Sequence, residues 1–251
     1  MKQFERQSEI LDLIQQGKCS NVKELCSAVY ASPATIRRDL RELEKKALVH
    51  LQYGHIIPLT EKAIVPPLAF RERQAIESKR AIGRYAASLI APNSSVLLDA
   101  SSTTMYIADY LNPNQGITVF TNCIKTAMKL CERDITFYLI GGLVDTKNLV
   151  TSGSWTIDDI DKINADYFFF SSLGMDNHGN ISTQSESGVQ TRKHMIKHSK
   201  QQYFLCSSEK IGSCYTFFLC NSKEITGVIA DADISFIPGI NSINVNDIYR
   251  D

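Results

Sequence analysis

Hydroxyl and carboxylate side chains gather directly after an apolar run that ends at residue 98. The segment 98–104 reads Leu-Asp-Ala-Ser-Ser-Thr-Thr, and we expect a helix to begin near Thr103. Free amides at a helix start, combined with hydroxyls and small side chains, favour a phosphate-binding loop. Serine and threonine also cap helices for purely structural reasons, so the pattern alone leaves both readings open. The candidate ligand-binding residues of this loop are Asp99, Ser101, Ser102, Thr103 and Thr104.

Further candidates follow three other apolar runs. Asn122 comes after the run at 117–120, and Gly141 and Gly142 follow the run at 135–140. Glycine lets the backbone approach a ligand closely. Lys210 lies beyond the run at 202–206, where it would neutralise a phosphate as a point charge or serve as an ordinary solvated lysine.

The elements that position these residues alternate between short apolar runs and helical stretches. This alternation predicts an α/β fold with a mostly parallel sheet, in which ligands bind at the carboxyl ends of the strands. An amphipathic helix over 71–90 leads into it. The expected strands cover 95–98, 117–120, 135–140, 167–171, 202–206 and 227–230.

The first sixty residues have a different pattern. Apolar spacing predicts a helix that Gly17 ends and a short second helix capped by Asn21. Ser32 and Pro33 are a start signal for a third helix. Two short runs flanking Tyr53 and Gly54 then predict a β-hairpin. This order is typical of a winged helix-turn-helix, although a solvated helical bundle without DNA contacts fits the same pattern.

The third helix has an apolar side and a cationic side. On a helical wheel, Ile36, Leu40, Leu43 and Ala47 share one side, and the basic residues lie opposite. Arginine can bind guanine edges or phosphates in the major groove, and a threonine hydroxyl can do the same. The candidate DNA-binding residues are Ser32, Thr35, Arg37, Arg38, Arg41 and Lys45.

Composition limits the class of protein. The chain has 251 residues, 43% hydrophobic and 22% charged, with a formal net charge of zero, so any DNA contact must be local.

Pro66 and Pro67 predict a linker over 60–70 between a DNA-binding domain at 1–59 and a sensing domain at 71–251. Seven scattered cysteines without paired spacing favour reduced packing residues, and no run is long enough to cross a bilayer, so we expect a cytoplasmic protein.

The N-terminal motifs resemble the DeoR family of bacterial transcription regulators. The resemblance rests on 5–7 (Glu-Arg-Gln), 10–11 (Ile-Leu), 32–40 (Ser-Pro-Ala-Thr-Ile-Arg-Arg-Asp-Leu) and 43–44 (Leu-Glu). Residues 51–55, Leu-Gln-Tyr-Gly-His, depart from the family's wing, where a basic residue precedes His-Gly-Gly-Ala.

The resemblance continues over nearly the whole chain, at 97–104, 121–122, 141–142 and 207–212. It implies a sensor domain related in fold to phosphosugar isomerases, which binds a phosphorylated sugar or a similar metabolite and changes operator affinity. It also implies a repressor of a sugar-metabolism operon and a homo-oligomer, a dimer or a tetramer. Glu186 and Arg192 occupy positions where the family has acidic and basic residues.

Departures from the family lie in the predicted pocket. Ser101 replaces a glycine, residues 171–174 read Ser-Ser-Leu-Gly in place of Gly-Ala-Asp-Gly, and Ser207 replaces an aspartate. Two acidic groups are therefore missing from their usual positions.

Two other functions compete with regulation by a phosphosugar. An isomerase-like enzyme would use Asp99, Glu186 and Lys210 as acid, base and electrostatic stabiliser, but the missing acidic groups and the DNA-reading domain argue against catalysis. A metal-responsive regulator would use His194 and His198, whose i, i+4 spacing on a helix would let both bind one metal ion. Nearby lysines oppose binding of a divalent cation. Since no nucleotide-binding motif is present, we expect neither a cofactor nor a bound metal.

Overall fold

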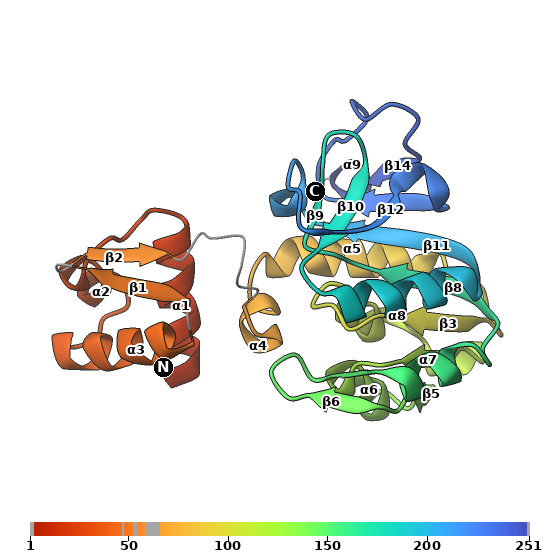
Figure 1. The fold of residues 1–251 in the computed structure, drawn as a ribbon, viewed down its shortest axis with the longest axis horizontal. Coiled ribbons are helices and arrows are strands. Elements are labelled where there is room, and N and C mark those ends of the chain that lie inside the picture. Colours follow the sequence, from red (N-terminus) through yellow and green to blue (C-terminus); the bar gives the residue numbers. More distant parts are fainter. Residues whose placement is uncertain (1–2, 47, 53–54, 59–65, 250–251) are drawn as a thin grey trace. The chain divides into compact units, whose positions relative to one another are not determined.

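The chain divides into two compact units, residues 1–74 and 75–251 (Figure 1). The computed structural model describes residues 3–46, 48–52, 55–58 and 66–249. Within these residues no helix is both long and apolar enough to cross a bilayer.

The N-terminal unit is the winged helix-turn-helix that the sequence predicts. Its elements are α1 (Gln3–Gln15), α2 (Val22–Ala28), α3 (Pro33–Lys45), β1 (Val49–Gln52), β2 (His55–Pro58) and α4 (Leu68–Arg71). The predicted caps are confirmed, because the Asn21 and Ser32 side chains accept from the backbone N–H of the third residue of α2 and of α3. β1 and β2 pair antiparallel. The turn at 53–54 lies outside the described residues.

One apolar core holds this unit together. Ile36, Leu40 and Leu43 of α3 are buried in it, as the helical wheel predicts, whereas Ala47 lies outside the described residues. A buried ion pair ties α3 to α1: Arg6 Nε lies 2.5 Å from Asp39 Oδ2, and Gln7 Nε2 donates to the other carboxylate oxygen at 3.3 Å. Asp39 is fully buried, so this pair positions the cationic helix on its neighbour.

Residues 66–76 differ from the continuous helix predicted over 71–90. The short helix α4 ends at Arg71, and the next helix begins at Ile76, after Ala75 with a left-handed φ of 48°. The aromatic ring of Phe70 packs against Phe4 at 5.0 Å between centroids. The apolar pattern behind that prediction begins at Ile76, and the polar residues 71–74 carry no apolar signal that would mark where the helix starts.

The C-terminal unit is built on a seven-stranded, wholly parallel sheet in the order β14-β13-β11-β8-β3-β4-β5. This confirms the predicted α/β architecture. The bounds of the strands are β3 (Ser95–Leu98), β4 (Thr118–Thr121), β5 (Thr136–Leu139), β8 (Ala165–Phe170), β11 (Ser199–Cys206), β13 (Gly227–Ala230) and β14 (Ser242–Asn244).

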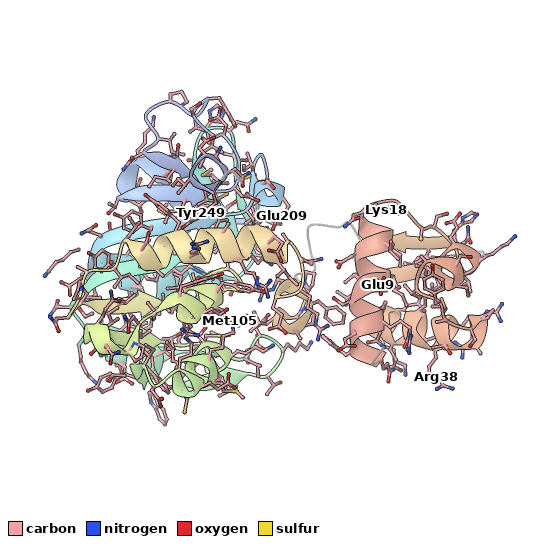
Figure 2. All side chains as sticks on the ribbon, turned by 180° about the vertical axis from the view of Figure 1, so that it is seen from behind. Glu9, Lys18, Arg38, Met105, Glu209 and Tyr249 are labelled. Carbon is pink, nitrogen blue, oxygen red and sulfur yellow. The ribbon has the colours of Figure 1, made fainter. Side chains whose placement is uncertain are left out.

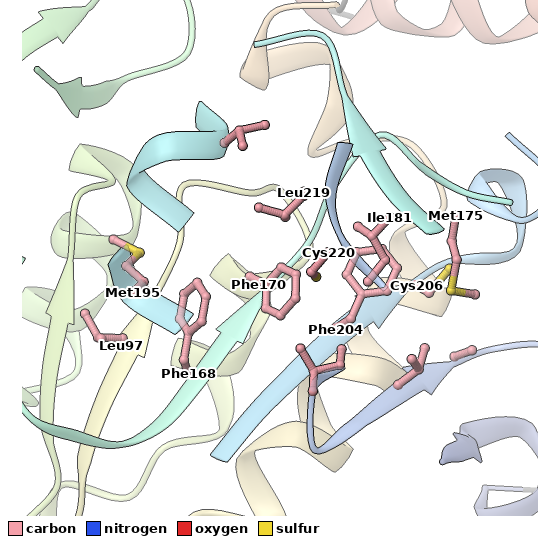
Figure 3. Packing of buried hydrophobic residues seen from close by; sticks show 14 of the residues in the cluster. Leu97, Phe168, Phe170, Met175, Ile181, Met195, Phe204, Cys206, Leu219 and Cys220 are labelled. Carbon is pink, nitrogen blue, oxygen red and sulfur yellow. The ribbon is translucent and has the colours of Figure 1, made fainter. Parts of the chain in front are cut away.

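Both faces of this sheet are covered by apolar cores. The strand β8 shows it most directly, since Phe168 and Phe170 enter one core and Phe169 enters the other. Figure 3 shows Phe168, Phe170 and Phe204 side by side in the first of these cores. A strand buried on both faces carries a continuous apolar run, as central parallel strands do.

Helices and short 3-10 turns connect the strands. The α-helices are α5 (Ile76–Ser88), α6 (Ile124–Glu132), α7 (Ser154–Ile160), α8 (Glu186–Lys197) and α9 (Val245–Ile248). The 3-10 segments are η1 (Thr104–Tyr110), η2 (Pro113–Gln115), η3 (Ser208–Lys210) and η4 (Ser222–Glu224). A Cβ at Gly83 of α5 would come within 2.9 Å of Tyr106, so glycine there lets α5 pack closely on η1.

Two small antiparallel sheets are absent from the sequence prediction. One pairs β6 (Leu143–Asp145) with β7 (Val150–Ser152), and the other has the order β12-β10-β9 (Phe217–Asn221, Asn180–Thr183, Gly174–Met175). Their strands are two to five residues long, too short for a periodic signal.

Asp166 joins the beginnings of three central strands. It accepts from Lys200 Nζ at 2.8 Å and from the Ser95 N–H at 2.9 Å, and these bonds lower its pKa to about 2. Because the folded-state pKa is depressed, the stabilisation is present above the usual value of 3.8 and is lost as pH falls toward 2. We expect Asp166→Asn to lower the melting temperature at neutral pH. The difference from wild type should shrink below about pH 4 in a pH series of thermal melts, and a constant difference would contradict this role.

Candidate functional site

The start of α3 is held by two of the predicted DNA-binding residues. Ser32 Oγ accepts from the Thr35 N–H at 3.2 Å, and the two hydroxyl oxygens lie 2.8 Å apart. Ser32 is therefore the N-cap of the helix. The hydroxyl of Thr35 is engaged with the cap, so a base contact by Thr35 would require exchange of this bond.

The basic residues of α3 form a solvent-facing row. Arg37, Arg38 and Arg41 are exposed, and none of them forms an ion pair with a described residue. Arg38 lies at the surface of its unit (Figure 2). Lys45 is also exposed but pairs with Glu42 at 2.8 Å. The three arginines therefore keep their guanidinium groups available for an anionic partner.

In the second unit, Asp99 follows β3 and is almost fully buried. Arg192 Nε of α8 donates to Asp99 Oδ2 at 2.8 Å, and the Ser171 N–H donates to the same oxygen at 3.3 Å. The Thr104 hydroxyl lies 3.0 Å from Oδ1. Both carboxylate oxygens therefore accept hydrogen bonds, and Asp99 holds Arg192, Ser171 and Thr104 in place.

Ser101 and Thr104 complete this network. Ser101 Oγ accepts from the Thr104 N–H at 3.0 Å and lies 2.8 Å from the Thr104 hydroxyl. A helix start is expected near Thr103, and the structure has the 3-10 segment η1 there. The Ser101 hydroxyl accepts from the N–H of its first residue, Thr104.

Lys210 reaches the same strand ends from η3. Its Nζ donates to Ser171 Oγ at 2.7 Å and to Thr103 Oγ1 at 3.2 Å. Ser171 in turn donates to the backbone oxygen of Leu205. The hydroxyl of Ser171 therefore links Lys210 to the sheet, and Lys210 and the Asp99–Arg192 pair meet at the carboxyl ends of β3, β8 and β11.

The sequence marks Arg192 only as a position where the family has a basic residue. Its contact with Asp99 joins two residues that are 93 positions apart in the chain. Ser185 caps α8 by accepting from the Gly188 N–H at 3.0 Å, and Arg192 also donates to the Gly188 carbonyl at 3.2 Å. No spacing in the sequence could signal this pairing, because it depends on how α8 packs across the sheet.

A second group of predicted residues lies at the ends of β4 and β5. Asn122 Nδ2 donates to the Thr151 carbonyl at 2.9 Å, and its buried Oδ1 has no hydrogen-bond partner within the described part of the chain. Gly142 has φ of 140°, and a Cβ there would meet Thr156 Oγ1 at 2.1 Å. Gly142 therefore has a structural reason to be glycine, whereas a Cβ at Gly141 would meet nothing within 4 Å.

The remaining predicted residues join neither group through a hydrogen bond. Ser102 is a buried residue of the 98–104 loop, and Glu186 is exposed in the first turn of α8. Among described residues Glu186 has no ion pair or hydrogen bond, so its proposed place in the site rests on the resemblance alone.

Two carboxylates lie beside Ser207, the position where the family has an aspartate. Ser207, fully buried, donates to Glu209 Oε1 at 2.5 Å, and Asp231 accepts from the Ser208 N–H at 2.6 Å. Beside them, burial raises the pKa of the Cys206 thiol to about 12. Cys206 therefore stays protonated and packs as an apolar residue.

The two histidines of the metal alternative share a carboxylate. His194 Nδ1 and His198 Nε2 lie 2.7 Å and 3.1 Å from Asp161 Oδ1. The hydrogen bond to His194 lowers the pKa of Asp161. No group of three histidine, cysteine or acidic residues within the described ranges has a geometry that could hold a metal ion.

A winged helix-turn-helix with exposed arginines on its third helix, joined to a parallel α/β unit with partly buried cations at its strand ends, defines a DNA-binding regulator with a sensor domain. Residues 6–61 match the DeoR-like helix-turn-helix domain, and residues 74–232 match the DeoR C terminal sensor domain. The chain belongs to the DeoR family of transcription regulators.

Curated relatives agree with this assignment. The HTH-type transcriptional repressor GlcR of Bacillus subtilis is 33% identical over 92% of this chain and 89% of the relative. FruR of the same organism, named as an uncharacterized HTH-type transcriptional regulator, is 26% identical over 91% of each. The α/β unit is similar to a ribose 5-phosphate isomerase from Plasmodium falciparum, with a TM-score of 0.38 and 14% identity over 53% of this chain and 52% of that one. The relatives are regulators, and the α/β unit of this chain is a sensor domain rather than an enzyme.

Proposed function

We propose that this regulator represses a sugar-metabolism operon in the cytoplasm until a phosphorylated sugar or a related metabolite binds its sensor domain. The observation that carries the effector proposal is the meeting of Lys210 and Arg192 around Asp99. Repression is supported by the similarity to GlcR, which is a transcriptional repressor. Effector binding would shift the population toward a state with low operator affinity.

Operator recognition rests on the free cations of α3. In a helix-turn-helix, this helix enters the major groove and its exposed side chains read base edges or hold phosphates. Arg37, Arg38 and Arg41 have the exposure and the free guanidinium groups that this requires. Ser32 and Thr35 set the start of the helix, and Lys45 would exchange its bond to Glu42 for a phosphate.

Arg38→Ala should weaken operator binding by about 1–3 kcal/mol, or about 5- to 150-fold, if the side chain contacts a base edge. Fluorescence anisotropy at fixed salt measures the change, and specific and nonspecific duplexes separate base from phosphate contacts. Lys18→Ala, an exposed cation of the same unit outside α3, is the matched control. Equal affinity of Arg38→Ala and wild type would remove Arg38 from the interface.

The sensor site holds two cations at the ends of the strands. Arg192 is paired with the Asp99 carboxylate, whereas Lys210 donates to the hydroxyls of Ser171 and Thr103. Hydroxyls of Ser101, Ser102 and Thr103 lie on the adjoining loop, where the ends of parallel strands bind ligands. A phosphate would replace the hydroxyl acceptors of Lys210 with an anionic one, and sugar hydroxyls would contact the polar rim, including Asn122 and Gly141.

Thermal shift measurements with phosphorylated and free sugars test this proposal. A ligand at about 100 times its dissociation constant adds about 2.7 kcal/mol, or several degrees, to the stability. We expect a shift with a phosphosugar, little shift with the free sugar, and loss of the shift in Lys210→Met. Lys147→Met, an exposed lysine of the same unit, should keep it. A shift that survives in Lys210→Met would place the phosphate elsewhere.

A further inference from the structure

The outer edge of the seven-stranded sheet is formed by β5, and no described residue pairs with it on that side. Its sequence, Thr-Phe-Tyr-Leu, holds neither a charge nor a proline. Proteins usually protect a free sheet edge with charges, prolines, bulges or a covering element, because an apolar edge recruits another strand. The opposite edge strand, β14, is shorter and carries Ser242 and Asn244. The β5 edge therefore has the properties of an interface.

Exposed apolar side chains are carried by β5 and by two further elements at the same end of the unit. Tyr138 of β5 is 60% exposed, Leu143 of the β6 hairpin 78%, and Trp155 of α7 76%. Leu139 of β5 and Val144 of β6 are exposed as well. Figure 1 places β5, β6 and α7 at one end of the sensor unit. We call these five residues the β5 patch.

Charge decides which partner the β5 patch fits. Residues 135–144 contain no charged side chain, so an acidic or basic partner would find no counter-charge along the edge. An identical edge meets it without repulsion and supplies the same unpaired backbone groups. The chain also carries a single recognition helix, α3, whereas helix-turn-helix regulators read two half-sites as dimers.

We propose that the β5 patch is the interface with a second copy of this chain, in which the two β5 strands pair antiparallel and the sheets become continuous. A closed dimer uses the same surface on both copies, so its two-fold axis crosses this edge. The axis keeps equivalent faces of the two sheets on the same side, which brings Tyr138 within about 5–8 Å of the partner subunit's Tyr138. The inference rests on the proposed function only in that two half-sites require two recognition helices.

Charge variants of Tyr138 test the interface in the full chain. Tyr138→Lys and Tyr138→Glu should each raise the dimer dissociation constant at least about tenfold, because like charges meet at the axis. An equimolar mixture of the two should dimerise again, since the charges are then opposite. Sedimentation velocity over a concentration series measures both effects. Phe218→Lys, at a half-exposed aromatic residue of β12, is the control that should assemble as wild type does.

The mixture separates loss of the interface from misfolding, because opposite charges rescue pairing only if the two side chains meet. A monomeric wild type, unchanged assembly of both variants, or variants that dissociate without rescue would each overturn the proposal. Amide exchange adds a direct readout: β5 amides should be protected in the wild-type dimer and exchange faster in Tyr138→Lys. If the monomeric variants still show the thermal shift with a phosphosugar, effector binding does not depend on dimerisation. The interface proposal and the sensor proposal can therefore fail independently.

Discussion

Asp39→Ala is expected to destabilise the DNA-binding unit by about 3 kcal/mol or more, because it leaves the Arg6 guanidinium without its buried counter-charge. Asp39 is fully buried and the Arg6 side chain is 17% exposed, so water can replace the carboxylate only in part. The amide of Gln7 loses its acceptor as well. Since domains of this size are stable by about 5–15 kcal/mol, the loss is large.

Thermal melting and operator titration distinguish this effect from a direct effect on DNA. Removal of an acidic group beside Arg38 would by itself strengthen binding to phosphates, whereas unfolding weakens it. Glu42→Ala, which removes an exposed carboxylate from the same helix, should change stability by less than about 0.5 kcal/mol. Arg6→Met combined with Asp39→Leu should recover much of the loss. An unaltered melting temperature in Asp39→Ala would show that the pair is not structural.

Asp99→Ala is expected to cost about 3–5 kcal/mol in the sensor unit and to abolish the effector response. The Arg192 side chain is 16% exposed and would lose its counter-charge, while the Ser171 N–H would lose its acceptor. Ligand binding would fail because Arg192 is no longer positioned. DNA binding below the melting temperature should persist, since α3 belongs to the other unit.

A matched variant tests whether Asp99 positions Arg192 or contacts the effector. Asp109→Ala removes the partner of the half-exposed Lys129 and should cost less than about 1 kcal/mol. In Asp99→Leu combined with Arg192→Met, stability should return while the effector shift stays lost. If Asp99→Ala melted as wild type does and lost only the effector shift, Asp99 would be a direct ligand contact, and the positioning role would be wrong.

The sequence by itself determined the elements whose signals are local. Ser32 before Pro33, the apolar spacing of α3 and the arginines opposite it depend on neighbours within two helical turns, and the structure confirms them. The central strands were predictable because burial on both faces requires long apolar runs, such as Phe168–Phe170. The helix break at Ala75 and the small sheets were missed, because a left-handed residue and very short strands leave no periodic trace.

Only the tertiary structure decided how the site is assembled. The sequence identified Asp99 and Lys210 as separate candidates, but the pairing of Asp99 with Arg192 and of Lys210 with Ser171 joins segments 93 and 39 residues apart. Such contacts depend on the order of the strands in the sheet and on the packing of α8. Local patterns determined which residues could do chemistry, whereas the fold decided which of them meet, because contact across a sheet is set by strand order rather than by distance along the chain.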